Sequence, residues 1–210
     1  MTKGGGRRKR RVSSVEQRFQ IKVYCEGDTE ENYLNYWRQE YRDKTVVTIA
    51  PNPHTASLDI VKLAAKHRAQ ELGESKRDED GDPYNEYWCF FDVDDDDKNG
   101  KLNLALELAE RENIYVALSN PCLELWFLLH MENQTGYIDR GKVQSLVYKK
   151  FGCEKPHLPP AAMDMLSQNF GDAKGRALKL DQKHEGDGTK PPWNPSSNVW
   201  ALVEKIRSGK

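Results

Sequence analysis

Long hydrophobic runs, paired cysteines and an excess of either charge are all missing from this sequence of 210 residues. No apolar stretch approaches the roughly 20 residues that a membrane-spanning helix needs, and no signal-type apolar core follows the basic N-terminus. We therefore expect no membrane segment and a cytoplasmic location. The motifs GxxxxGKS/T and GxGxxG, typical of nucleotide-binding loops, are also missing.

The four cysteines are Cys25, Cys89, Cys122 and Cys153, which are widely spaced and form no CxxC pair. This spacing argues against a zinc ribbon and against a disulfide framework. Three of the cysteines lie inside apolar segments, which predicts reduced thiols in the protein core.

Charge is nearly balanced over the whole chain but uneven along it. Charged residues make up 31% of the sequence and the formal net charge is -1, so there is no overall electrostatic footprint for nucleic acid. Residues 3–11 are strongly basic, whereas residues 78–97 are strongly acidic. The basic run is either a flexible, solvated tail or an arm that binds nucleic acid. The side chains that would make such contacts are Arg7, Arg8, Lys9, Arg10 and Arg11.

Strand and helix patterns alternate up to about residue 120. Strands are predicted over residues 18–25, 45–51, 87–93 and 114–119. The helices between them are predicted to begin with a capping box of Asp28 and Glu31, near Ser57, and at residue 101, and a polar loop is predicted over residues 73–83. Regular alternation of this kind predicts an α/β fold, with a mostly parallel sheet and helices on both faces.

The remaining chain is predicted to be helical. A short buried helix begins near Pro121, a second helix ends at Gly152, and loops surround one or two helices over residues 153–196. Ser196 or Ser197 is expected to cap a last helix. The apolar face of that helix consists of Val199, Leu202, Val203 and Ile206.

These patterns divide the chain into three segments. Residues 1–17 are glycine-rich and basic with few apolar residues, which predicts a disordered tail. Residues 18–135 form the expected Rossmann-like α/β core. Residues 136–210 form a helical and loop extension that we expect to pack on this core.

Carboxylates follow two of the predicted strands at the same edge of the sheet. Glu26 comes directly after the first strand, and Asp92 and Asp94 end the third. Period-two alternation places the two aspartates on one side, at the strand ends where α/β folds bind ligands. Two unit charges at ~4 Å repel by about 1 kcal/mol in water and about 4 kcal/mol near a protein surface. The cluster is therefore either a solvated acidic loop or a site for Mg²⁺ or Mn²⁺, which prefer oxygen ligands.

Polar residues also follow the fourth strand. Asn120 lies at its carboxyl end, on the same rim as Glu26 and Asp92. Glu124 stands in a very apolar segment, where an unpaired carboxylate is costly to bury. Glu124 therefore either faces outward from an amphipathic helix or points at the same metal or at a basic partner.

Four motifs occur in order at fitting intervals: CEGDTEENYLNYW, WCFFDVDDDD, SNPCLELWFLLH and NPSSNVW. Together they resemble the RloB-like family, a branch of the Toprim-fold proteins encoded near bacterial restriction and abortive-infection loci. The resemblance covers residues 19–206, nearly all of the chain outside the basic tail.

The resemblance implies a Toprim-like core and a set of site residues. Toprim domains have a glutamate after the first strand and a DxD motif after the third, and they bind Mg²⁺ to make or break phosphodiester bonds. Glu26 would be a general acid or base and a metal ligand, and Asp92 and Asp94 would be catalytic metal ligands. Asp96 would extend the metal site.

A second element of the resemblance is the motif SNPxxELW. Asn120 and Glu124 match this element, and they form an additional candidate site whose role the resemblance leaves open. Leu123 stands where the family usually has an aromatic residue, which is a mild departure from the pattern.

The first functional hypothesis is a nuclease dependent on Mg²⁺ or Mn²⁺. It would cleave RNA such as tRNA, or DNA, in anti-phage abortive-infection defence, beside the ATPase partner that the resemblance implies. Lys98, Lys101 and the basic tail would contact nucleic acid. Lys174 would either stabilise the transition-state charge or be a solvated helix lysine. His54 would reach the strand-end rim, whereas His130 is expected to be a packed residue at a helix end.

Two alternatives remain. The acidic pocket could bind a metal or nucleotide without catalysis and so regulate an ATPase partner, which the near-neutral net charge favours. Polymerising chemistry, as in Toprim primases, is the weaker alternative. The sequence predicts no oligomeric state.

Overall fold

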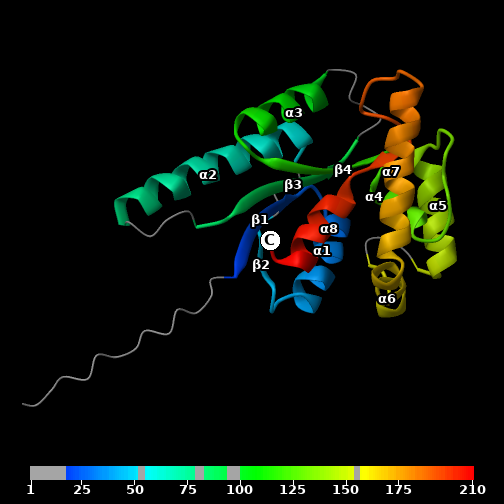
Figure 1. Cartoon of the computed structure of the whole chain (residues 1–210), viewed down its shortest axis with the longest axis horizontal. Helices are drawn as coiled ribbons and strands as arrows, with labels where there is room; N and C mark the ends of the chain where they lie inside the picture. Colours follow the sequence, from blue (N-terminus) through cyan, green and yellow to red (C-terminus); the bar gives the residue numbers. More distant parts are fainter. Residues whose placement is uncertain (1–17, 52–54, 79–82, 94–99, 154–156) are drawn as a thin grey trace, which may run out of the picture.

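A five-stranded sheet with the order β2-β1-β3-β4-β5 lies at the centre of the protein (Figure 1). The computed structural model describes residues 18–51, 55–78, 83–93, 100–153 and 157–210. The strands are β1 (Phe19–Cys25), β2 (Thr45–Ile49), β3 (Glu86–Asp92), β4 (Tyr115–Asn120) and β5 (Ser196–Ser197). The first four pair in parallel and β5 runs antiparallel to β4, so the predicted mostly parallel, Rossmann-like sheet is confirmed.

Helices cover both faces of the sheet. They are α1 (Asp28–Glu40), α2 (Ser57–Asp78), α3 (Lys101–Arg111), α4 (Leu123–Leu129), α5 (Arg140–Phe151), α6 (Pro160–Gln168), α7 (Phe170–Gly186) and α8 (Val199–Ser208). In Figure 1, α2 and α3 lie on one face, whereas α1 and α8 lie on the other, with α4 to α7 beside them. Within the described residues, none of the helices is long and apolar enough to cross a membrane.

The central strand β3 is buried on both faces. Trp88 and Phe90 belong to the core cluster shared with α1, α4 and α8, whereas Cys89 and Phe91 belong to the cluster under α2 and α3. Successive side chains of a strand point to opposite faces, so a strand that is covered on both sides needs an unbroken apolar run. This explains the segment YWCFF, and it places Asp92 where the buried strand ends.

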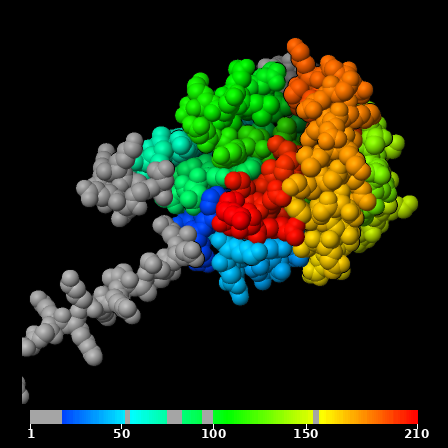
Figure 2. Space-filling model, in the orientation of Figure 1, coloured from blue at the N-terminus to red at the C-terminus, as the bar shows by residue number. Residues whose placement is uncertain are grey.

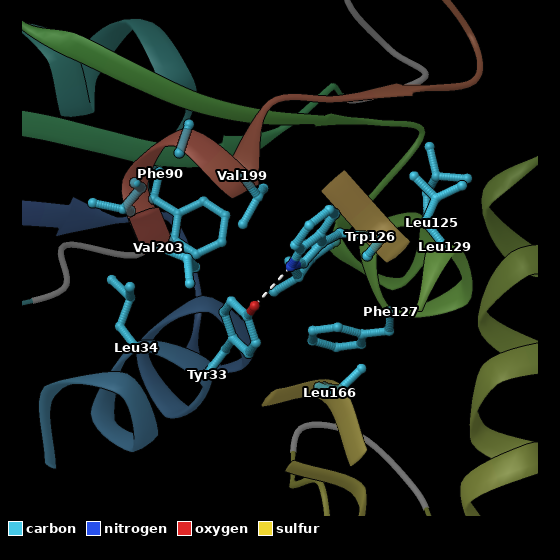
Figure 3. Close-up of a cluster of buried hydrophobic side chains, with 14 of the residues drawn as sticks. Tyr33, Leu34, Phe90, Leu125, Trp126, Phe127, Leu129, Leu166, Val199 and Val203 are labelled. Carbon is cyan, nitrogen blue, oxygen red and sulfur yellow. Dashed lines mark hydrogen bonds between the residues drawn. The ribbon is translucent and has the colours of Figure 1, made fainter. Parts of the chain in front are cut away.

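The larger core cluster joins the sheet to the C-terminal helices (Figure 3). Trp126 of α4 is fully buried, and its indole nitrogen donates a hydrogen bond of 2.6 Å to the hydroxyl of Tyr33 on α1. Leu166 of α6 and Val203 of α8 pack into the same cluster. The helices after residue 136 therefore share one core with the strands.

Two predicted helix starts are wrong. The capping box of Asp28 and Glu31 does not form, because α1 begins one residue earlier than that motif requires, with Gly27 as the N-cap residue and no side-chain cap. Ser196 and Ser197 do not cap α8, because they form β5 against the edge of β4. The residue before α8 is Asn198, whose side chain continues this edge by bonding to backbone groups of β4 at 2.6 Å and 3.0 Å.

The predicted polar loop over residues 73–83 is wrong in its first half. The helix α2 continues to Asp78, beyond the position where Gly73 suggested a stop. A glycine in a helix interior costs only about 1 kcal/mol relative to alanine. The surrounding helix formers compensate for that cost, so the helix passes through it.

Candidate functional site

The strand order places a topological switch point between β1 and β3. The chain leaves β1 toward β2 on one side of the sheet and returns to β3 on the other, and such points form ligand-binding crevices at the carboxyl ends of the strands. Glu26 follows β1 and Asp92 ends β3. The carboxylate of Glu26 accepts a hydrogen bond of 3.1 Å from the backbone N–H of Asp92. The two strand-end acids are therefore adjacent, as the sequence predicts.

Asp92 is buried and only partly hydrogen-bonded. One carboxylate oxygen, Oδ2, accepts a bond of 3.3 Å from Nη1 of Arg140. The other oxygen, Oδ1, is buried and accepts no hydrogen bond from the described residues. A buried carboxylate oxygen without a hydrogen-bond donor is unfavourable, so Oδ1 is the atom that a bound cation would stabilise most directly.

Glu124 does not face outward from α4. Its side chain is buried, and its carboxylate accepts bonds from the hydroxyl of Tyr148 at 2.8 Å and from the amide of Gln144 at 3.4 Å. Potential ligand atoms of Asp92, Cys122 and Glu124 all lie within 4.8 Å of one another. The interpretation of Glu124 as a solvated helix acid is therefore wrong, and it lies beside the strand-end carboxylates.

Negative charge exceeds positive charge around Asp92. Burial raises the pKa of Asp92 well above its usual value, and the nearby carboxylates of Glu30, Glu124 and Glu26 raise it further, whereas the Arg140 guanidinium lowers it. Deprotonation at this position therefore needs more positive charge than Arg140 supplies. A divalent cation would provide it.

The sequence did not reveal Glu30. It lies in the first turn of α1, four residues after Glu26, and its side chain is buried. A Cβ at Gly27 would lie 3.0 Å from its Oε2 atom, so the carboxylate folds back along the turn that joins β1 to α1. Glu26 lies outside α1, before its N-cap residue Gly27, so no helical spacing in the sequence linked it to Glu30.

Arg140 is the second residue that sequence patterns missed. It is the first residue of α5, and its guanidinium donates to the backbone oxygens of Val93 and Pro121 as well as to Asp92. Gln144 and Tyr148 follow it at intervals of four residues, so one polar stripe of α5 faces the carboxylates. The spacing of this polar stripe can be read in the sequence, but the carboxylates that it faces cannot.

The residues present fit a hard divalent cation. Asp92 and Glu124 supply carboxylate oxygens within 4.8 Å of one another, which Mg²⁺ and Mn²⁺ prefer, and the carboxylates of Glu30 and Glu26 are near enough to add negative charge. The Cys122 thiol is a poorer ligand, because burial and the neighbouring Glu124 carboxylate raise its pKa and keep it protonated. The buried cysteines Cys25, Cys89 and Cys122 are free thiols, as predicted.

The other predicted site residues have contacts elsewhere, are exposed, or lie outside the described residues. Asn120 ends β4 and donates to the backbone oxygen of Pro192 at 3.5 Å. Lys101 is the exposed first residue of α3. Lys174 pairs with Glu204 at 2.5 Å, on α8. The candidates outside the described residues are His54, Asp94, Asp96, Lys98 and the basic tail with Arg7, Arg8, Lys9, Arg10 and Arg11.

His130 is a packed residue, as predicted. Its Nδ1 atom donates to the backbone oxygen of Trp126 at 2.8 Å, and its ring meets the Trp126 ring edge to face, with centroids 4.5 Å apart. Burial lowers the pKa of His130 to about 3. The imidazole is therefore neutral in the folded protein at neutral pH and is not exposed to a substrate.

Acid is expected to destabilise the protein through His130. The unfolded chain binds a proton at this residue below about pH 6.5, whereas the folded protein does not until about pH 3, so stability is lost as pH falls through that window. At about pH 5, this difference in proton binding lowers the free energy of unfolding by about 2 kcal/mol. Urea unfolding at about pH 7 and about pH 5 measures it, and His130→Phe should remove it.

The exposed residue His157 provides the control for this experiment. His157→Gln should leave the acid sensitivity unchanged, because the side chain lies at the surface. Asp92 has a raised pKa and acts in the opposite sense, gaining stability as pH falls, so the comparison must be between variant and wild type. Equal acid sensitivity in His130→Phe and wild type would contradict the prediction.

Comparison with known proteins adds one finding to this geometry. No curated protein and no solved structure matches the chain. The family model described as RloB-like protein matches residues 21–206, which include both strand-end acids, Glu124, β5 and most of α8. This chain therefore belongs to the RloB-like family.

Proposed function

We propose that the protein is a nuclease that depends on Mg²⁺ or Mn²⁺ and hydrolyses phosphodiester bonds in RNA, with tRNA as the candidate substrate, or in DNA. The observation that carries the proposal is the buried, unbonded Oδ1 of Asp92 among the carboxylates of Glu26, Glu30 and Glu124. These groups lie at a switch point, where α/β sheets bind their ligands. Surplus negative charge in such a crevice suits a divalent cation that also binds phosphate.

The side chains divide into holding and activating groups. Asp92 and Glu124 are buried and would hold the cation, which when bound neutralises phosphate charge and lowers the pKa of water. Glu26 is only half-buried, so it is the carboxylate best placed to orient or deprotonate an attacking water. Arg140 fixes the orientation of Asp92 through the bond to Oδ2. Asp94 and Asp96 remain predicted ligands.

The wider role rests on the resemblance to Toprim-fold proteins. A glutamate after β1 and an aspartate at the end of β3 match the Toprim pattern in the described residues. We propose that the protein acts in the cytoplasm, in anti-phage abortive infection, with an ATPase partner.

Metal-dependent cleavage tests this function. Purified protein is incubated with tRNA and with plasmid, in Mg²⁺, in Mn²⁺ and in EDTA. Cleavage should require the metal and should fall by about 10²–10³-fold in Asp92→Asn and in Glu26→Gln, because each removes charge that is preorganised at the reacting phosphate. Asp59→Asn, an exposed acid of α2, is the matched control and should cleave normally. Undiminished cleavage in both site variants would refute the assignment.

The second candidate is a regulator that binds metal without cleaving nucleic acid. The net charge of -1 favours it, because nucleases commonly present a basic surface. Calorimetric Mn²⁺ binding that is lost in Asp92→Asn, with no cleavage of either substrate in the presence of the ATPase partner, would support the regulator and exclude the nuclease.

A further inference from the structure

A basic cavity of about 250 Å³ lies between α7 and the segment that follows α4. Arg176, Lys179 and Lys183 line one side of it, and Leu129 and Thr135 line the other. The three cations recur at helical spacing, so they form one stripe along α7, the orange helix of Figure 2. Among the residues that the structure describes, the lining contains no carboxylate.

The cations of this stripe are oriented by neutral partners. Arg176 donates to the backbone oxygen of Leu129 at 2.6 Å, and Lys183 donates to the backbone oxygen of Thr135 at 2.7 Å. Carbonyl oxygens fix these side chains without cancelling their charge. The nearest acids along the same stripe are Asp172, one turn before Arg176, and Asp187, one turn after Lys183, and neither lines the cavity. The cavity therefore holds positive charge that suits an anion.

An exposed aromatic residue follows the segment that lines the cavity. Tyr137 follows Thr135 by two residues and is 75% exposed, more than the other exposed large apolar side chains of the described residues. The next residue is fixed on both sides, because the side chain of Asn194 bonds the backbone N–H and C=O of Ile138 at 3.2 Å and 3.0 Å. The ring is thus held at the surface by an anchored backbone, available for stacking.

We propose that this basic cavity and Tyr137 bind a single-stranded segment of nucleic acid. The cations would contact backbone phosphates while the ring stacks on a base, a combination that such binding sites use. The exposed ring favours nucleic acid, whose bases can stack on it. An acidic peptide would need only the positive charge of the cavity. This inference rests on the proposed nuclease function and deepens it by locating a surface that holds the substrate.

The surface is separate from the carboxylate cluster. Glu124 lies in the first turn of α4 and Leu129 ends the helix, so the two sites lie at opposite ends of a helix about 10 Å long. Substrate binding can therefore be measured without metal, and its failure can be distinguished from failure of catalysis.

Fluorescence anisotropy with a labelled single-stranded RNA in EDTA tests the inference. The variants are the double substitution Lys179→Gln with Lys183→Gln, and Tyr137→Ala. The matched control is Lys62→Gln with Lys66→Gln on α2, which has the same spacing and similar exposure. We expect affinity to fall about tenfold in each cavity variant. The salt dependence should lose about 1 unit of slope per lysine in the double variant alone.

Several results would overturn the inference. They are equal affinity and salt slope in wild type and the double variant, an equal loss in the α2 control, and wild-type binding to an acidic peptide but not to RNA. Unfolding temperatures for all variants identify losses caused by misfolding, and Lys179→Gln alone preserves the Lys183 bond to Thr135. Loss of RNA binding in the double variant, with metal-dependent cleavage absent from wild type, would retain the binding surface and reject only the nuclease.

Discussion

Replacing Trp126 with alanine is expected to lower the free energy of unfolding by about 3–5 kcal/mol. Trp126 is fully buried where α1, α4 and α7 meet, and its ring contacts His130 and Phe170. The substitution leaves a large cavity and removes the indole N–H that donates a hydrogen bond to the Tyr33 hydroxyl (Figure 3). Urea denaturation, with the transition followed by circular dichroism, measures the loss.

Two controls separate packing from hydrogen bonding. Trp126→Phe keeps most of the ring volume and should cost less than the alanine variant, because it loses chiefly the bond to Tyr33. Trp200→Ala removes a tryptophan that is only half-buried and should also cost less. A loss of less than about 1 kcal/mol for Trp126→Ala would show that this cluster is not a cooperative part of the core.

Replacing Arg140 with methionine is expected to cost about 2–3 kcal/mol in EDTA. Removing one partner of a fully buried ion pair costs about 3–5 kcal/mol, and we expect a smaller cost here because the Arg140 side chain is 27% exposed. The substitution leaves Asp92 with its carboxylate neighbours and no guanidinium. Since burial and these neighbouring charges raise the pKa of Asp92, the free-energy penalty should shrink as pH falls and the carboxyl takes up a proton.

A double-mutant cycle isolates this interaction. Asp92→Asn removes the charge that Arg140 balances, so the combined variant should be more stable than Arg140→Met alone. Mn²⁺ should stabilise Arg140→Met more than wild type, because the cation replaces the missing positive charge. Arg111→Met is the control, since that exposed pair with Glu112 contributes little. Additive effects of the two substitutions would contradict a direct coupling.

Most of the fold could be predicted because strands and helices leave a periodic pattern of apolar residues in the local sequence. The unbroken apolar run of β3 predicted a strand that is covered on both faces, and the structure buries all of it. Helix ends were less predictable. The capping box at Asp28 and the loop after Gly73 failed because neighbouring residues and packing outweigh a single cap or glycine.

The candidate site was predictable only in part. Glu26 and Asp92 follow parallel strands, and such strand ends must share one edge of the sheet. The apolar segment around Glu124 did not reveal whether its side chain is buried or exposed. Its partners Gln144 and Tyr148 come from another helix. The pairing of Lys174 with Glu204 likewise depends on how α7 meets α8.

The sequence by itself determined the alternation of strands and helices and the rim on which the first two acids stand, because both depend on residues close together in the chain. Only the tertiary structure decided which charges meet there. Arg140 reaches Asp92 across 48 residues of sequence, and it does so because α5 packs on α4 and presents its polar stripe to the strand ends. Charge compensation acts through space, so no local pattern encodes it.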